Sequence, residues 1–285
     1  MRKRQPTEQP LTQINNSGEG ARAAAKLAAQ GDSFCRNLSH LNDAALDEAL
    51  RCWAQRTSLS DADLGALRQL PFSFRTVDRD GFIVREGEMP TSCSLILSGS
   101  AFRQKMVRNG ARQIISFHFP GEFIDLQSCL LTVNDHSVQA MMACKLAAVP
   151  KDALLALVDR RPGIARALWY DTLLEGAIFR EWVVNVGRRN ARARIAHLLC
   201  ELAVRLGESA ADGTVYRLPL TQEHIADATG MTSVHTNRTI QGLRKDGLIS
   251  MALGRLEVHD WDALRSIGDF SDLYLHRDGR RPLRG

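Results

Sequence analysis

Long uncharged apolar stretches are absent from this sequence of 285 residues. No run approaches the roughly 18 to 20 apolar residues that a membrane-spanning helix needs. The basic start, Arg2 to Arg4, leads into a polar segment rather than into the hydrophobic core of a signal peptide. We therefore expect a cytoplasmic protein that has no membrane partner.

Motifs that carry enzymatic chemistry are missing as well. The sequence contains no His-x-His pair of the kind that binds metal inside a β-barrel, and no Gly-x-Ser-x-Gly nucleophile elbow. It also lacks a Gly-Lys-Ser phosphate loop and a dinucleotide-binding glycine fingerprint. We therefore expect that the protein is not an enzyme.

Cysteine is present, but without the spacing of a metal site. The six cysteines include no Cys-x-x-Cys pair, and they are Cys35, Cys52, Cys93, Cys129, Cys144 and Cys200. Scattered cysteines in a chain of this size are most often reduced, buried thiols. The 44% hydrophobic and 24% charged residues are ordinary for globular domains, and a net charge of +5 is compatible with a phosphate-binding surface.

The texture of the sequence changes along the chain and divides it into segments. Residues 1–30 are polar or Ala-rich and are interpreted as a disordered or weakly helical arm. Residues 31–160 begin with two amphipathic entry helices and continue, from Phe72 to Pro150, as short apolar runs separated by glycines. Many short, evenly spaced strands predict a β-roll or barrel.

A long helix is predicted for residues 161–187, which begin with Pro162-Gly163. Its apolar stripe is wider than one flank of a small domain requires. Packing against its own β-roll and packing against a second copy both remain open, and the pattern favours a dimer. The predicted dimerisation residues are Leu174, Ile178, Trp182 and Val186.

Residues 188–270 have the order of a winged helix-turn-helix domain, followed by a basic tail over 271–285. An amphipathic helix and a short strand precede Thr221, which we expect to be the N-cap of the next helix. Thr229-Gly230-Met231-Thr232 then forms the small turn that sets a second helix at a steep angle, and the strands around Gly254 form the wing.

The second helix, from Ser233 to Lys245, carries the candidate DNA-reading residues at its exposed start. Arginine can pair with both guanine acceptors in the major groove, and asparagine can pair with an adenine edge. The predicted DNA-binding residues are Thr221, Ser233, Val234, His235, Asn237 and Arg238.

Five motifs in this order resemble the Crp-Fnr family of transcription regulators. Residues 81–88 (GFIVREGE), 95–99 (LILSG) and 119–123 (FPGEF) are similar to its β-roll signatures, and 220–232 and 233–240 are similar to its helix-turn-helix. The resemblance implies an α+β protein with a jelly-roll-like β-roll sensor domain, a long dimerisation helix and a C-terminal winged helix-turn-helix. It also implies a homodimer that binds a near-palindromic site in double-stranded DNA, and contact with RNA polymerase if the protein is an activator.

The sensor half departs from the cyclic-nucleotide binders of that family. Where those proteins carry a Gly-Glu pair for the ribose and an Arg-Ser pair for the phosphate, this sequence has Asp125-Leu126 and His136-Ser137. Because the phosphate arginine is missing, we expect no tight binding of cyclic AMP. Val234 stands where well-known members have a glutamate that accepts a hydrogen bond from cytosine, so the half-site sequence does not follow from theirs.

The sequence bears in the same way on two other cofactors of the family, an iron-sulfur cluster and haem. Cys35 and Cys52 lie far apart, and no third cysteine precedes Cys93, so an iron-sulfur cluster is not expected. Haem stays an option because His40, His118 or His136 can supply an axial ligand, although such histidines are more often hydrogen-bonded structural residues. We thus predict no cofactor and leave the effector unassigned. The alternative function is a ligand-binding module whose winged domain contacts proteins instead of DNA.

Overall fold

The computed structural model describes residues 41–57, 59–207, 211–252 and 254–277. The arm predicted for residues 1–30 and the last eight residues of the basic tail lie outside these ranges. The chain divides into two compact units, Met1–Ala44 and Ala45–Gly285, and all elements discussed below belong to the second. Within the described part of the chain, no helix is both long and apolar enough to cross a membrane.

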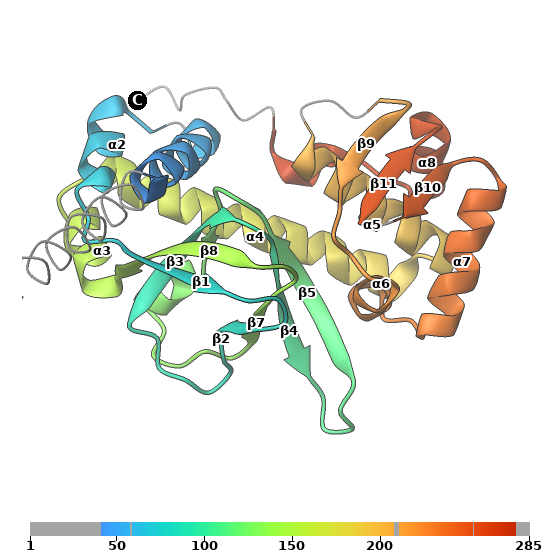
Figure 1. The fold of residues 1–285 in the computed structure, drawn as a ribbon, viewed down its shortest axis with the longest axis horizontal. Helices are drawn as coiled ribbons and strands as arrows, with labels where there is room; N and C mark the ends of the chain where they lie inside the picture. Colours follow the sequence, from blue (N-terminus) through green and yellow to red (C-terminus); the bar gives the residue numbers. More distant parts are fainter. Residues whose placement is uncertain (1–40, 58, 208–210, 253, 278–285) are drawn as a thin grey trace, which may run out of the picture. The chain divides into compact units, whose positions relative to one another are not determined.

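The β-rich segment forms two four-stranded antiparallel sheets with strand orders β1-β8-β3-β6 and β2-β7-β4-β5 (Figure 1). This arrangement confirms the β-roll that the short apolar runs predicted. Helix α2, Asp61–Arg68, precedes it and is capped by Ser60. The strands are β1 Ser73–Val77, β2 Phe82–Val84, β3 Ser92–Ser98, β4 Ala101–Met106, β5 Arg112–His118, β6 Phe123–Ile124, β7 Ser137–Ala140 and β8 Cys144–Pro150, and the 3-10 helix η1, Leu126–Cys129, lies between β6 and β7.

A tight turn between β3 and β4 shows why glycine punctuates these runs. Gly99 has φ +89°, a conformation that residues with a Cβ rarely adopt. A Cβ at this position would also lie 2.4 Å from the carbonyl oxygen of Ala143, which is closer than any real contact. The roll therefore closes at this turn only because residue 99 has no side chain.

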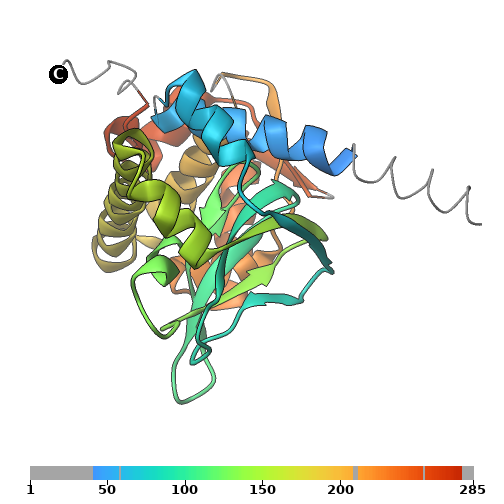
Figure 2. The same ribbon diagram turned by 90° about the vertical axis from the view of Figure 1, so that its left-hand side faces the viewer.

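Two helices follow the roll, α3 at Lys151–Val158 and the long α4 at Pro162–Arg188. Proline at the first turn suits a helix start, because its missing N–H has no partner there. The 27 residues of α4 span roughly 40 Å at 1.5 Å per residue. The ribbon shows α4 running beside the sheets, and Figure 2 gives the same arrangement turned by 90°.

The C-terminal elements form a winged helical domain. Buried Leu199, Ile240 and Leu256 share one apolar core with the neighbouring helices and strands. A three-stranded sheet, β10-β11-β9, forms the wing. The elements are α5 Ala191–Leu206, β9 Thr214–Arg217, α6 Gln222–Thr229, α7 Ser233–Lys245, β10 Ile249–Ala252, β11 Arg255–Val258, α8 Trp261–Ile267 and η2 Asp272–Leu275.

Candidate nucleic-acid interface

The first helix of the candidate interface, α6, is closed at both ends by local hydrogen bonds. The Thr221 hydroxyl accepts from the His224 backbone N–H at 3.1 Å, and the His224 ring accepts from the Thr221 N–H at 3.3 Å. Gly230 ends the helix with φ +64°. Thr221 is therefore the N-cap that the sequence predicted, and its position fixes where the following turn begins.

The second helix, α7, is held to the domain by one face and leaves the other open. Thr236, Ile240 and Leu243 are buried, so this face of α7 packs against the core of the domain. Thr232 caps the helix by accepting from the His235 N–H at 3.3 Å. The predicted residues on the opposite face are exposed, and they are Ser233, Val234, His235 and Arg238.

Arg238 is the strongest candidate for reading bases. Its guanidinium is exposed, and among the described residues it has neither an ion-pair nor a hydrogen-bond partner. Val234 is 64% exposed one helical turn earlier, where an apolar side chain has no core to join. An open arginine and an open valine at the start of one helix are suited to a surface that a groove of DNA covers.

Asn237 is placed differently from its predicted neighbours. It is half-buried, and its amide donates a hydrogen bond of 2.7 Å to the side-chain oxygen of Gln222, the first residue of α6. This bond joins the starts of the two helices. Sequence reasoning missed Gln222, although its position directly after the N-cap Thr221 places it at the same edge as α7.

A second residue that the sequence did not indicate is Arg192, at the start of α5. It lines a shallow depression of about 460 Å³ together with His235 and Arg238. Its guanidinium pairs with Asp246 at 2.6 Å, which ties α5 to the end of α7. The depression thus brings a second guanidinium beside the open face of α7, and Asp246 pairs with it.

A buried ion network occupies the heart of the β-roll. The Asp125 carboxylate accepts from Arg103 at 2.9 Å and from His136 at 2.8 Å, and all three side chains are at least 95% buried. Arg103 also pairs with Glu175 of α4. Burial opposes ionisation of Asp125, but the hydrogen bond from His136 and the charge of Arg103 hold its pKa below the ordinary value.

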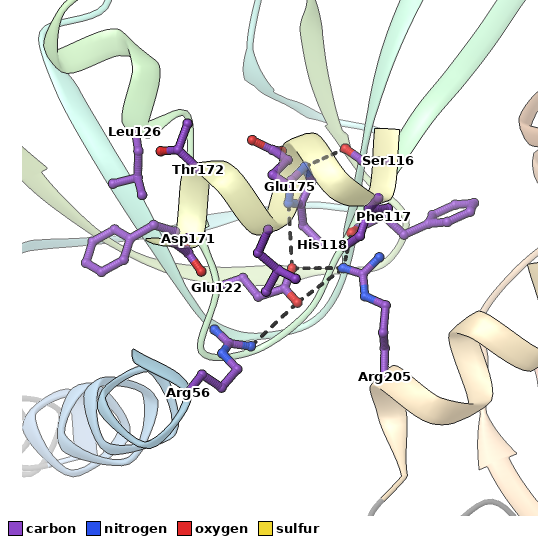
Figure 3. A pocket seen from close by; sticks show the side chains of 13 residues that line it. Arg56, Ser116, Phe117, His118, Glu122, Leu126, Asp171, Thr172, Glu175 and Arg205 are labelled. Carbon is purple, nitrogen blue, oxygen red and sulfur yellow. Dashed lines mark hydrogen bonds and ion pairs between the residues drawn. The ribbon is translucent and has the colours of Figure 1, made fainter. Parts of the chain in front are cut away.

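A second cluster surrounds Glu122 where β5, α4 and α5 meet (Figure 3). Arg205 approaches the Glu122 carboxylate to 3.2 Å, Arg56 to 3.6 Å and His118 to 3.7 Å. Burial raises the pKa of Glu122, but the charge of Arg205 more than offsets it and keeps that pKa well below its usual range. The adjoining cavity measures about 60 Å³.

Comparison with known proteins agrees with both halves of this description. The cyclic nucleotide-binding domain family matches residues 74–161, and the Crp-like helix-turn-helix domain family matches residues 193–267. The chain belongs to the Crp-Fnr family.

Two curated relatives and one solved structure illustrate the similarity of this Crp-Fnr protein to others. A probable transcriptional activator of Rhizobium leguminosarum bv. viciae is 28% identical over 67% of this chain and 79% of its own length. The transcriptional activator protein FnrL of Cereibacter sphaeroides is 26% identical over 74% of this chain and 86% of its own. The structure of FixK2 from Bradyrhizobium japonicum covers 71% of this chain and 100% of its own, with a TM-score of 0.65 and 23% identity. This Crp-Fnr protein is thus a DNA-binding transcription regulator.

In the β-roll, the residues that the sequence comparison aligned with nucleotide-binding positions are engaged with one another. Asp125 and His136, which align with the ribose and phosphate positions, are bonded to each other at 2.8 Å. The nearby guanidinium of Arg103 is already shared between Asp125 and Glu175. A cyclic phosphate placed at these residues would meet the buried Asp125 carboxylate, and the guanidinium of Arg103 beside it is already engaged.

The histidines considered for haem are also engaged. His118 contacts Ser116 at 2.9 Å through one ring nitrogen and Glu122 at 3.7 Å through the other. His136 bonds Asp125 and Asp135 through its two ring nitrogens. Axial ligation by either ring would have to break these contacts, and His40 lies outside the described residues. No group of three His, Cys, Asp or Glu suited to a metal occurs in the part of the chain that the structure describes.

Helix α4 of this Crp-Fnr protein presents a different face to solvent from the one predicted. Ile178 and Trp182 are buried inside the chain's own core, with Trp182 against the ring of Phe117. Leu174 is half-buried on the same core, and Val186 is half-buried too. The predicted stripe therefore packs on the chain's own β-roll and α5, which was the alternative to packing against a second copy. The large apolar side chains that α4 leaves exposed are Trp169, Leu173, Val183 and Val184.

Proposed function

We propose that this protein is a homodimeric regulator that reads a near-palindromic promoter site with the starts of two α7 helices. The observation that carries the proposal is Arg238, which is exposed and unpaired within the described residues on the open face of α7. Each bidentate contact with a base contributes about 1–3 kcal/mol of discrimination. Two symmetry-related helices would read half-sites about 34 Å apart, in the cytoplasm where chromosomal DNA is accessible.

The proposed dimer forms along the exposed face of α4. Trp169 is 67% exposed, Leu173 54% and Val183 72%, which leaves a row of large apolar side chains uncovered. Positions on this face alternate in steps of three and four residues, the spacing of a coiled-coil seam. They are Arg166, Trp169, Leu173, Gly176, Arg180, Val183 and Gly187. A second copy of the same helix covers such a seam in an isologous manner.

The signal for this regulator is proposed to be something other than cyclic AMP. The bonds that Asp125 makes with His136 and Arg103 support this, because they engage the residues that align with the nucleotide-binding positions of the family. Arg103 also reaches Glu175, which lies next to Gly176 of the proposed seam. A change in the roll would thus act on α4 and on the spacing of the two α7 helices. Since the curated relatives are named activators, we propose RNA polymerase as the second partner.

The test begins with genome-wide recovery of DNA bound to the full chain, followed by binding measurements on the recovered site. Arg238→Ala is expected to lose about 1–3 kcal/mol of discrimination at one base of each half-site, while dimerisation stays intact. The matched control is Arg244→Ala, which removes an exposed arginine from the last turn of the same helix. The control should leave base preference unchanged.

The competing function, in which the winged domain binds a protein, predicts a different result. Phosphate contacts make DNA affinity fall steeply between two salt concentrations, with a slope that grows with the number of phosphates neutralised. A chain that shows no such dependence and recovers no common sequence would contradict the proposal. Equal preference of the wild type and Arg238→Ala across a randomised site library would remove Arg238 from the reading surface.

A further inference from the structure

Two thiols meet in the β-roll, beside the backbone of Asp125 and outside the candidate nucleic-acid interface. The Sγ atoms of Cys93 and Cys129 lie 3.3 Å apart. Cys93 is on β3, and Cys129 is the last residue of η1, 36 positions later. Among the described residues, this is the only pair of cysteine side chains in contact.

The two thiols differ in their access to solvent. Cys93 is completely buried, and its sulfur is also within 3.4 Å of the Asp125 carbonyl oxygen. Cys129 is half-buried and lies in the wall of an apolar groove of about 480 Å³, between η1, α3 and α4. Leu130 and Leu131 beside it are 81% and 55% exposed. A small neutral oxidant can therefore reach Cys129 and not Cys93.

The charges around the pair favour the same division of roles. The hydrogen bond with Cys93 and the charge of Lys151 lower the pKa of the Cys129 thiol, and they outweigh burial, which acts in the opposite direction. The same hydrogen bond, together with burial, raises the pKa of the Cys93 thiol. Since the thiolate is the reactive form, Cys129 is the nucleophile of the two and Cys93 keeps its proton.

We propose that Cys93 and Cys129 are a reversible disulfide site whose oxidant is hydrogen peroxide. The Cys129 thiolate attacks the peroxide oxygen and breaks the O–O bond, so that sulfur becomes a sulfenic acid and the leaving oxygen departs as water after taking up a proton. The Cys93 thiol then attacks the sulfenic sulfur, the S–S bond forms, and a second water leaves with the thiol proton. Two thiols are thereby oxidised while one peroxide is reduced.

Little movement is needed to close the bond. A disulfide has an S–S distance of about 2.05 Å, so the sulfur atoms must approach by little more than an ångström. The movable partner is Cys129, because it ends a short 3-10 helix, whereas Cys93 is held within the central sheet. Movement of η1 acts directly on Asp125, which precedes this helix and binds Arg103. The site is independent of DNA binding and is tested without it.

The other described cysteines make suitable controls. Cys144 and Cys200 are fully buried, and burial raises the pKa of their thiols to about 11 and about 12. Cys52 is exposed, but no thiol partner contacts it within the described residues. It therefore reports the reactivity of an ordinary surface thiol.

The experiment treats the reduced full-length protein with hydrogen peroxide and maps its peptides by mass spectrometry. We expect one linked peptide pair that contains Cys93 and Cys129, with the loss of two hydrogen atoms, and its complete disappearance on reduction with dithiothreitol. Cys52→Ser should form the link as the wild type does, and Cys129→Ser should form none. Cys93→Ser should instead accumulate a sulfenic acid at Cys129, which dimedone captures.

Folding of each variant is checked by its circular dichroism before oxidation. Cys129 is half-buried, so we expect Cys129→Ser to fold. Its failure to form the link therefore tests the proposal even if Cys93→Ser does not fold. Oxidation of Cys52 while Cys93 and Cys129 both remain alkylatable would overturn the proposal. Linkage of Cys129 to any cysteine other than Cys93 in the folded monomer would overturn it too.

Discussion

Removal of Arg103 from the buried network should destabilise the protein strongly. In Arg103→Met, a side chain of similar length replaces the guanidinium, and the carboxylates of Asp125 and Glu175 lose their shared partner. Breaking a buried pair on one side costs about 3–5 kcal/mol, because a buried charge is left uncompensated. One acceptor of Asp125, Oδ2, already lacks a partner among the described residues, so the structure offers it no replacement.

The matched control for this variant is Lys105→Met on the same strand. The Lys105 side chain is 44% exposed and pairs with Glu86 at 3.7 Å, so its removal should change the free energy of unfolding by about 0–1 kcal/mol. Urea unfolding of all three proteins at one protein concentration, followed by circular dichroism, measures both changes. Equal midpoints for Arg103→Met and Lys105→Met would refute the reasoning.

The difference between Arg103→Met and the wild type should also depend on pH. The pKa of Asp125 in the folded wild type lies below its ordinary value of 3.8, because hydrogen bonds from His136 and the charge of Arg103 outweigh burial. Its contribution to stability is therefore present above pH 3.8 and is lost as the pH falls through the lowered pKa. The destabilisation by Arg103→Met should be largest near neutral pH and shrink in acid. A constant difference across this range would contradict the assignment.

Three further changes test other parts of the molecule. Leu173→Glu should dissociate the proposed dimer in sedimentation velocity, because Leu173 lies on its seam. The control Met106→Glu should not, although Met106 is as exposed as Leu173 (55% and 54%). Gly99→Ala should destabilise the roll in thermal unfolding by more than the about 1–2 kcal/mol expected for Gly110→Ala, because both glycines have positive φ but only a Cβ at Gly99 meets backbone within 4 Å. Burial raises the pKa of Asp171 to about 6, so the folded state favours its protonated carboxyl. The contribution of this carboxyl to protein stability is complete below pH 3.8 and is lost as the pH rises through about 6. Asp171→Asn should therefore flatten the decline of the melting temperature over this interval, and an unchanged decline would exclude that assignment.

Local signals explain which elements the sequence predicted well. Thr221 caps α6 and Gly230 ends it through bonds that span no more than a few residues, so the helix-turn-helix can be read from a short stretch of sequence. The turn at Gly99 and the start of α4 at Pro162 are local in the same sense. The open face of α7 follows because Ile240 and Leu243 can point only toward the core.

The network in the sensor could not be predicted in this way. Arg103 lies 22 positions from Asp125 and 72 from Glu175, and the three come from a strand, a connection and a helix. Alignment with cyclic-nucleotide binders indicated that the phosphate arginine is missing. It did not indicate that a different arginine occupies the interior, because only the folded sheets bring β4 next to Asp125.

Helix α4 shows the limit of periodicity most clearly. Both of its faces carry apolar residues at helical spacing, and spacing alone does not distinguish the face that packs inward from the face that stays exposed. In the structure, Ile178 and Trp182 join the core while Leu173 and Val183 remain outside. Glu175, held by the buried Arg103, belongs to the inward side of α4. In the proposed dimer, α4 contacts the sensor on one side and its twin on the other, so it cannot shift on one side alone. We therefore propose α4 as the element through which a signal in the roll would reach the DNA-reading helices.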